Sequence, residues 1–81
     1  MKVTVRLFGS LREEAGCPAL DLELVEGASV ADLRGQLAGR MPSVAEFGPR
    51  LRLAVNLELA GEDQLLADGD EVALLPPVSG G

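Results

Sequence analysis

The chain has 81 residues, of which 13 are acidic and seven are basic, so its formal net charge is −6. This charge and a content of only two aromatic residues argue against nucleic-acid binding, which needs cations for the phosphates and aromatic rings for unpaired bases. With one cysteine and no histidine, an internal disulfide is impossible and the usual zinc and nucleophile–histidine sites are missing, so we expect no metal site and no catalysis by this chain alone.

The first 24 residues predict a hairpin of two strands. In residues 1–8, apolar side chains at the odd positions alternate with mostly polar side chains at the even positions, which is typical of a half-buried strand. Ser10 is expected to cap a short helical turn that Gly16 ends. A second alternation over residues 20–24 predicts the partner strand.

The main helix is predicted to begin after Ser29, which forms a start resembling a capping box with Asp32. Apolar residues then recur at spacings of three to four and share one face: Val30, Leu33, Leu37 and Met41. Pro42 is expected to close this helix, and residues 43–50 are expected to be irregular.

The last third of the chain predicts three further strands. Residues 51–56 alternate as a third strand, and residues 57–67 suggest a short strand followed by a tight turn. Asp68-Gly69-Asp70 is typical of a turn, after which residues 71–75 form the last strand. Pro76-Pro77 ends the sheet pairing because proline has no N–H to donate.

This order of elements predicts an α+β fold in which a mixed sheet packs on one main helix. We expect the last strand to pair with the first at the centre of the sheet, which is the β-grasp plan of ubiquitin-like proteins. The predicted organisation is one β-grasp domain, 1–75, and an extended C-terminal tail, 76–81.

The tail ends in Gly80-Gly81, and two interpretations are open. Glycine has no Cβ and tolerates φ of either sign, so such a tail is thin enough to enter a narrow channel and present its carboxylate for modification. The alternative is an ordinary frayed end.

The chain resembles the MoaD family, the sulfur-carrier small subunits of molybdopterin synthase. The resemblance is carried by Leu53-Ala54-Val55-Asn56, by Asp68-Gly69-Asp70-Glu71-Val72-Ala73 and by Pro76-Pro77-Val78-Ser79-Gly80-Gly81. The opening Phe8-Gly9-Ser10-Leu11-Arg12-Glu13, followed by Gly16, is similar to the first strand and short helix of that family. The resemblance spans the full length and is least specific over residues 40–50 and 57–67.

The resemblance implies a particular chemistry at Gly81. An E1-like activating enzyme that uses ATP and magnesium would adenylate its carboxylate, and a sulfur donor protein would convert the adenylate to a thiocarboxylate. The tail would then enter the large subunit of molybdopterin synthase and give its sulfur to cyclic pyranopterin monophosphate. A hetero-oligomer with that subunit is therefore expected, with catalysis on the large subunit and no cofactor held by this chain.

A docking surface is predicted on the sheet face away from the helix. The strand alternation places apolar side chains there, namely Phe8, Ala54, Ala73 and Leu75, with Arg6 and Arg52 at the edge. Outward apolar side chains that gather in a patch are typical of a partner surface.

Two other functions remain open at this point. Carriers for thiamine thiazole or for tRNA thiolation share the β-grasp fold and the Gly-Gly ending, and so do protein modifiers that form an isopeptide bond to a target lysine. A cytoplasmic location is expected, because no apolar run approaches the ~18 residues of a membrane span and a lone cysteine fits a reducing compartment.

Overall fold

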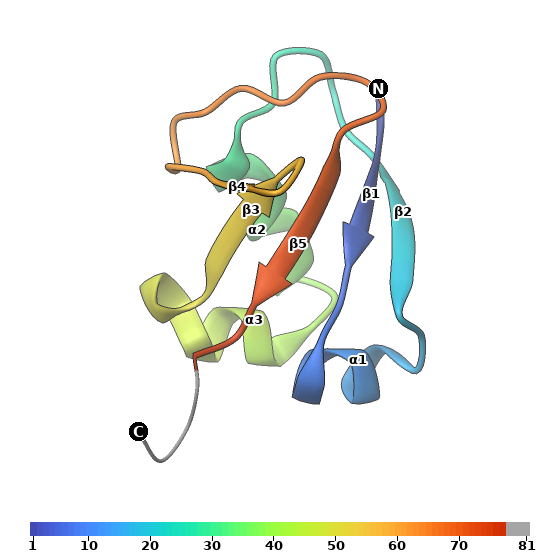
Figure 1. The fold of residues 1–81 in the computed structure, drawn as a ribbon, viewed down its shortest axis with the longest axis vertical. Helices are drawn as coiled ribbons and strands as arrows, with labels where there is room; N and C mark the ends of the chain where they lie inside the picture. The colour runs from blue at the N-terminus through green and yellow to red at the C-terminus, as the bar shows by residue number, and fades with distance from the viewer. Residues whose placement is uncertain (78–81) are drawn as a thin grey trace.

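The computed structural model describes residues 1–77, which form a five-stranded mixed sheet with helices on one face and at one end (Figure 1). The elements in chain order are β1 (Lys2–Arg6), α1 (Gly9–Ala15), β2 (Ala19–Glu23), α2 (Val30–Ala38), α3 (Pro42–Phe47), a 3₁₀ turn (Gly48–Arg50), β3 (Arg52–Val55), β4 (Glu58–Leu59) and β5 (Glu71–Leu75). None of the helices within residues 1–77 has both the length and the apolar character of a membrane-spanning segment.

The strand order is β2-β1-β5-β3-β4, and it confirms the predicted β-grasp plan. β5 lies parallel to β1, with Val5 opposite Val72, and antiparallel to β3, with Leu53 opposite Leu74. β1 and β2 form the antiparallel opening hairpin. The last strand is therefore at the centre of the sheet, with a neighbouring strand on each side, and its inward side chains are fully buried.

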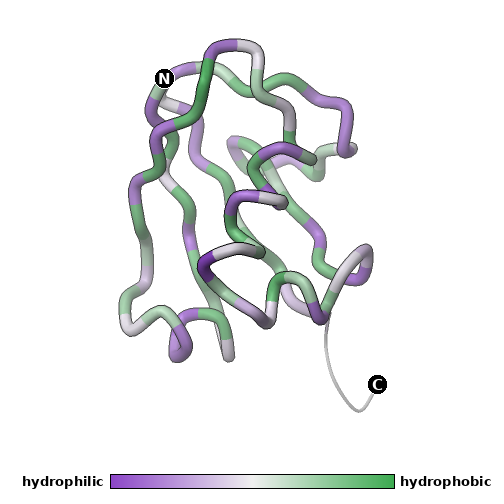
Figure 2. Tube along the Cα trace, turned by 180° about the vertical axis from the view of Figure 1, so that it is seen from behind, coloured by the Kyte–Doolittle hydropathy of each residue, from purple (hydrophilic) through white to green (hydrophobic). Residues whose placement is uncertain are grey.

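The core lies between the sheet and α2, and it is formed by every second side chain along the strands. Val3, Val5, Val72 and Leu74 are fully excluded from solvent, as is Leu33 from α2. Figure 2 shows the matching alternation of hydrophobic and hydrophilic residues along the chain. Because one face of each strand is committed to this core, the side chains between them must point to the opposite face of the sheet.

The start of α2 is the one that the sequence predicts. The Ser29 hydroxyl accepts a hydrogen bond from the Asp32 backbone N–H at 3.2 Å, and the Asp32 carboxylate accepts one from the Ser29 backbone N–H at 2.9 Å. This reciprocal capping box satisfies two of the N–H groups that a helix start leaves unpaired.

Two local predictions are wrong. α1 begins at Gly9 with Phe8 at the cap position and no side-chain cap hydrogen bond, so Ser10 is not its cap. α2 ends at Ala38, and Pro42 opens a new helix, α3, in a segment expected to be irregular. Proline suits the first position of a helix because its missing N–H has no partner there, so Pro42 marks a start rather than only a stop. Met41 is still buried, but as the cap residue of α3.

Candidate functional site

The candidate site is built around the end of β5. Leu75 is the last residue of this central strand, and Pro76 and Pro77 follow it, half-buried and without an N–H to pair with a neighbouring strand. The predicted tail residues Val78, Ser79, Gly80 and Gly81 lie outside the described residues. The site that the structure describes is therefore the surface from which the tail begins.

One row of side chains crosses the outer face of the sheet, opposite α2. The pairing register places Arg6 beside Ala73, Ala73 beside Ala54, and Ala54 beside Leu59. A second row, closer to the tail, places Arg52 beside Leu75. We call the apolar members of these rows, Ala54, Leu59, Ala73 and Leu75, together with Pro76 and Pro77, the outer apolar patch.

The structure brings most of the predicted surface residues together, with two differences. Ala54 is on the outer face but only 7% exposed, so it forms the floor of the patch rather than a contact surface. Phe8 is 45% exposed, but it follows the end of β1 and caps α1, so it is not part of the sheet. Ala73 and Leu75 are half-exposed, and Arg6 and Arg52 lie at the edge.

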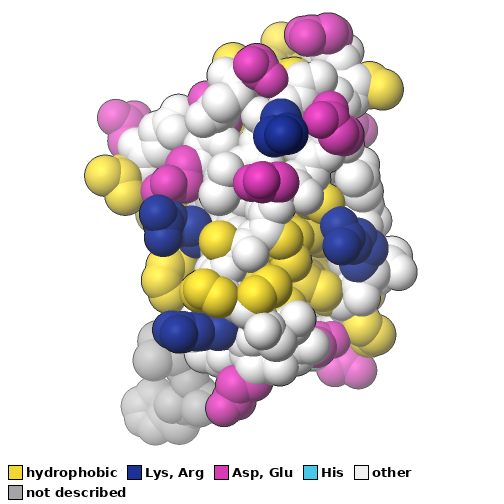
Figure 3. Space-filling model, turned by 90° about the vertical axis from the view of Figure 1, so that its right-hand side faces the viewer, with side chains coloured by type: hydrophobic (Ala, Val, Ile, Leu, Met, Phe, Trp, Pro, Cys, Tyr) yellow, Lys and Arg dark blue, Asp and Glu magenta, His cyan; other side chains and the backbone are white. Residues whose placement is uncertain are grey.

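Beyond the patch, the outer face of the sheet becomes polar. Thr4 donates from its hydroxyl to Asp21 at 3.1 Å, and the Asn56 amide donates to the Asp70 carboxylate at 2.9 Å. On the face of the molecule seen in Figure 3, apolar side chains gather between Lys and Arg side chains, and acidic side chains lie mainly above them, with a few below. The polar side chains at one end of the outer face are thus hydrogen-bonded to one another, whereas no described residue covers the apolar end.

The Arg6 side chain lies where the two ends of this face meet. Its guanidinium forms an ion pair of 3.1 Å with Glu71, and both side chains are about half exposed. Such an exposed pair contributes little to stability. It does hold the Arg6 charge at the boundary of the patch.

Sequence reasoning missed Leu59, a member of this patch, and Arg50, which lines a pocket together with Leu59 and Leu75. Leu59 is 60% exposed and reaches the patch because Asn56 and Leu57 form the tight turn between β3 and β4. Both turn residues have positive φ, 49° and 73°, which matches the two-residue turns that join antiparallel strands. The signal that could have revealed this turn was Asn56, because asparagine tolerates positive φ, but Leu57 obscured it.

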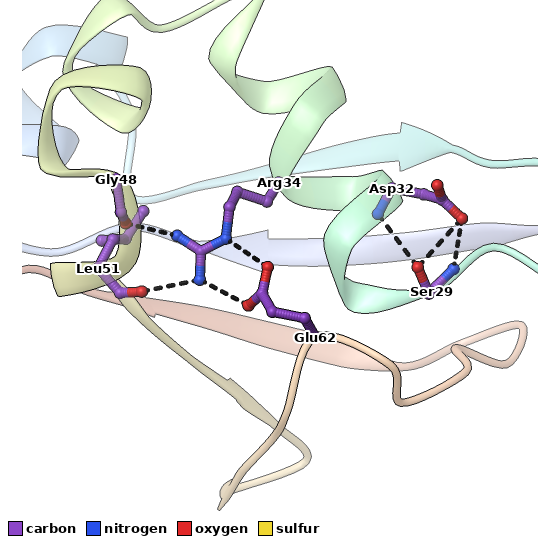
Figure 4. Close-up of polar contacts among 6 residues, drawn as sticks. All are labelled: Ser29, Asp32, Arg34, Gly48, Leu51 and Glu62. Atoms are coloured by element: carbon purple, nitrogen blue, oxygen red, sulfur yellow. Dashed lines mark hydrogen bonds and ion pairs between the residues drawn. The ribbon is translucent and has the colours of Figure 1, made fainter.

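Arg34 of α2 holds the backbone at Gly48 and Leu51, on either side of Arg50 (Figure 4). Its guanidinium donates to the Gly48 carbonyl at 2.8 Å and to the Leu51 carbonyl at 2.9 Å. It also forms a two-pronged pair with Glu62, at 2.9 Å from Nε and 2.8 Å from Nη2. One side chain, 19% exposed, thus ties the segment before β3 and the loop after β4 to the helix.

Arg34→Ala is expected to lower the free energy of unfolding by about 2 kcal/mol, because it leaves two carbonyls and a carboxylate without a charged partner. Urea denaturation followed by far-UV circular dichroism measures the change. Arg40→Ala is the matched control, since no hydrogen bond or ion pair of its side chain is found within residues 1–77. Equal stability losses in the two variants would contradict this role.

The comparisons with known proteins agree with this architecture. The model of the ThiS family matches residues 5–81. The molybdopterin synthase sulfur carrier subunit of Mycobacterium tuberculosis is 38% identical, over 100% of this chain and 99% of that protein. Small archaeal modifier protein 1 of Haloferax volcanii is 33% identical over 94% of this chain and 97% of that protein, and its crystal structure superposes with a TM-score of 0.85 at 32% identity, covering both chains completely.

A solved structure also contains a relative with a partner. It is a complex of subunits 1 and 2 of the molybdopterin-converting factor of Helicobacter pylori. The matching chain is 29% identical with a TM-score of 0.69, and both chains are covered completely. The fold of the present chain therefore occurs in carriers, in modifiers and in a two-subunit assembly.

Proposed function

This chain belongs to the ThiS family, and from that premise we propose that it is the sulfur carrier of molybdopterin synthase. The observation that carries the proposal is the extent of the likeness: the family match runs through residue 81, and the Mycobacterium tuberculosis carrier subunit aligns with the whole chain. The proposed reactive group is the carboxylate of Gly81.

The proposed reaction at Gly81 has two steps. A carboxylate is a poor electrophile, so an E1-like activating enzyme first joins it to AMP from ATP, with magnesium bound by that enzyme and pyrophosphate released. Sulfide delivered by a donor protein then attacks the acyl carbon, where a C–S bond forms as the C–O bond to AMP breaks, and AMP leaves. The product is a thiocarboxylate, in which one oxygen of Gly81 has been replaced by sulfur.

The carrier then gives up this sulfur inside its partner. We propose that the tail enters the large subunit of molybdopterin synthase, where the thiocarboxylate sulfur attacks cyclic pyranopterin monophosphate. Hydrolysis of the resulting thioester then breaks the acyl C–S bond, which leaves the sulfur on the pterin and restores the Gly81 carboxylate. Enclosure places the nucleophile against its target and keeps water from hydrolysing the thiocarboxylate. Pro76 and Pro77 limit the conformations at the tail's root, which lowers the entropy lost on entry.

The outer apolar patch is the proposed docking surface for the large subunit. It surrounds the point where the tail leaves β5, so a partner seated on it is in position to receive the tail. Phe8, which directly precedes α1, and Arg6 and Arg52 at the edge are proposed to take part in the same contact. The known complex of two subunits in the Helicobacter pylori relative supports this assembly.

The test is the intact mass of the chain after incubation with the activating enzyme, ATP and a sulfur donor. We expect a mass increase that corresponds to one oxygen replaced by one sulfur, and we expect it to require ATP. An unchanged mass with an activating enzyme that converts another carrier would overturn the proposal.

A second candidate function is protein modification, which the likeness to small archaeal modifier protein 1 favours. In that case, activated Gly81 would form an isopeptide bond to a lysine of a target. Lys2 is the only lysine here, so chains linked through several lysines are not possible. A ladder of adducts on a denaturing gel, formed with ATP and the activating enzyme, would support this alternative.

A further inference from the structure

A groove at the root of the tail carries positive charge on a protein whose net charge is −6. Its apolar lining includes Leu59, Leu75, Pro76 and Pro77, and its two charged lining residues are Arg50 and Arg52. No acidic side chain lines it within residues 1–77. We call it the tail-root groove.

The two arginines of the groove differ in their pairing from Arg6 and Arg34. Arg6 and Arg34 pair with carboxylates at 3.1 Å and 2.8 Å. Arg50 has a weak hydrogen bond of 3.5 Å to a backbone carbonyl and lies 5.9 Å from the ring centre of Phe47, and the described part of the chain supplies no carboxylate to Arg50 or Arg52. Their charges are therefore available to a partner.

The walls of the groove are held in place before any partner arrives. The Arg34 guanidinium binds the carbonyls of Gly48 and Leu51, which lie on either side of the segment that carries Arg50. The backbone of Arg52 is fixed by its pairing with Leu75 in the sheet. A site whose backbone is already in place loses less conformational entropy on binding, and this favours a higher affinity.

We propose that the tail-root groove binds an acidic segment of the large subunit of molybdopterin synthase, in which an Asp or Glu is flanked by apolar residues. A guanidinium binds a carboxylate through two parallel hydrogen bonds, and the apolar lining accepts the flanking side chains. The groove opens onto the outer apolar patch through Leu59 and Leu75, so one partner covers both surfaces. This proposal rests on the proposed function, because it assumes that the large subunit is the partner.

The experiment compares the affinity of the cognate large subunit for the full chain and for charge variants, by isothermal titration calorimetry at low and at moderate salt. The double variant Arg50→Glu/Arg52→Glu is expected to bind at least about tenfold more weakly, because it places like charges against the partner's carboxylate. The variant Arg50→Lys/Arg52→Lys is expected to retain most of the affinity. Wild-type affinity is expected to fall with salt more steeply than that of the Glu variant.

The control variants are Arg40→Glu, alone and combined with Arg12→Glu. The double control makes the same change in net charge, at residues that do not line the groove. An equal loss of affinity in the two Glu double variants would overturn the proposal, because the effect would then come from net charge alone. Unchanged affinity in Arg50→Glu/Arg52→Glu would overturn it as well.

The experiments test the carrier role and the role of the groove separately. If the wild-type chain acquires sulfur at Gly81 and binds the large subunit, the carrier role stands whatever the arginine variants show. If the wild-type chain does neither, the carrier role itself is wrong, and with it the assignment of the groove's partner.

Discussion

Deletion of Gly81 is expected to abolish sulfur transfer by this chain, with molybdopterin formation falling to the level seen without a carrier. In the proposed mechanism, the sulfur is carried on the Gly81 carbonyl carbon, so its loss removes the atom on which the adenylate and the thiocarboxylate form. A carboxylate on Gly80 would lie one residue short of its place in the partner, and small displacements of a reacting atom strongly reduce rates. The measurement is molybdopterin formed with the large subunit and its precursor.

The fold of the shortened chain is expected to be unchanged, because the core lies entirely within residues 3–74. Thermal unfolding checks this point. Addition of one residue after Gly81 is expected to have the same effect as the deletion, since it blocks the carboxylate without shortening the tail. Retained molybdopterin synthesis in either variant would contradict the mechanism.

Leu75→Asp is expected to weaken binding to the large subunit by about 30-fold, or about 2 kcal/mol, which is typical of a residue at the centre of an interface. Leu75 lies in the outer apolar patch next to the tail and opposite Arg52, so a carboxylate there would be placed against the partner's apolar surface. The activating enzyme is expected to lose affinity as well, because it must reach the same tail. Titration calorimetry with each partner measures both effects.

Val25→Asp provides the matched control for this substitution. Val25 is 78% exposed and follows β2, at the end of the sheet remote from the tail. The Val25→Asp substitution introduces the same charge outside the outer apolar patch, so the affinity of this variant for both partners is expected to match that of the wild type. Normal binding of Leu75→Asp to both partners would show that the patch is not the docking surface.

Strands and the main helix were predictable because their signals are local. The alternation in β1, β2 and β5 follows from burying one face of each strand, and the Ser29–Asp32 capping box is a contact between residues three positions apart. α3 was not predictable, because only Val44 of its six residues is buried. A helix this short is stabilised by packing rather than by its own sequence.

The sequence by itself determined the fold class, the inward and outward faces of the strands and the likeness of residues 76–81 to a carrier tail, because each depends on neighbouring residues. Tertiary structure decided how the outer side chains combine. The pairing of β3 with β5 sets Arg52 beside Leu75, the turn at Asn56 and Leu57 brings Leu59 to the patch, and Arg34 fixes the backbone beneath Arg50. The contacts of Arg52 with Leu75 and of Arg34 with the backbone near Arg50 join residues far apart in the chain through backbone register and a partly buried guanidinium, and no local pattern records either one.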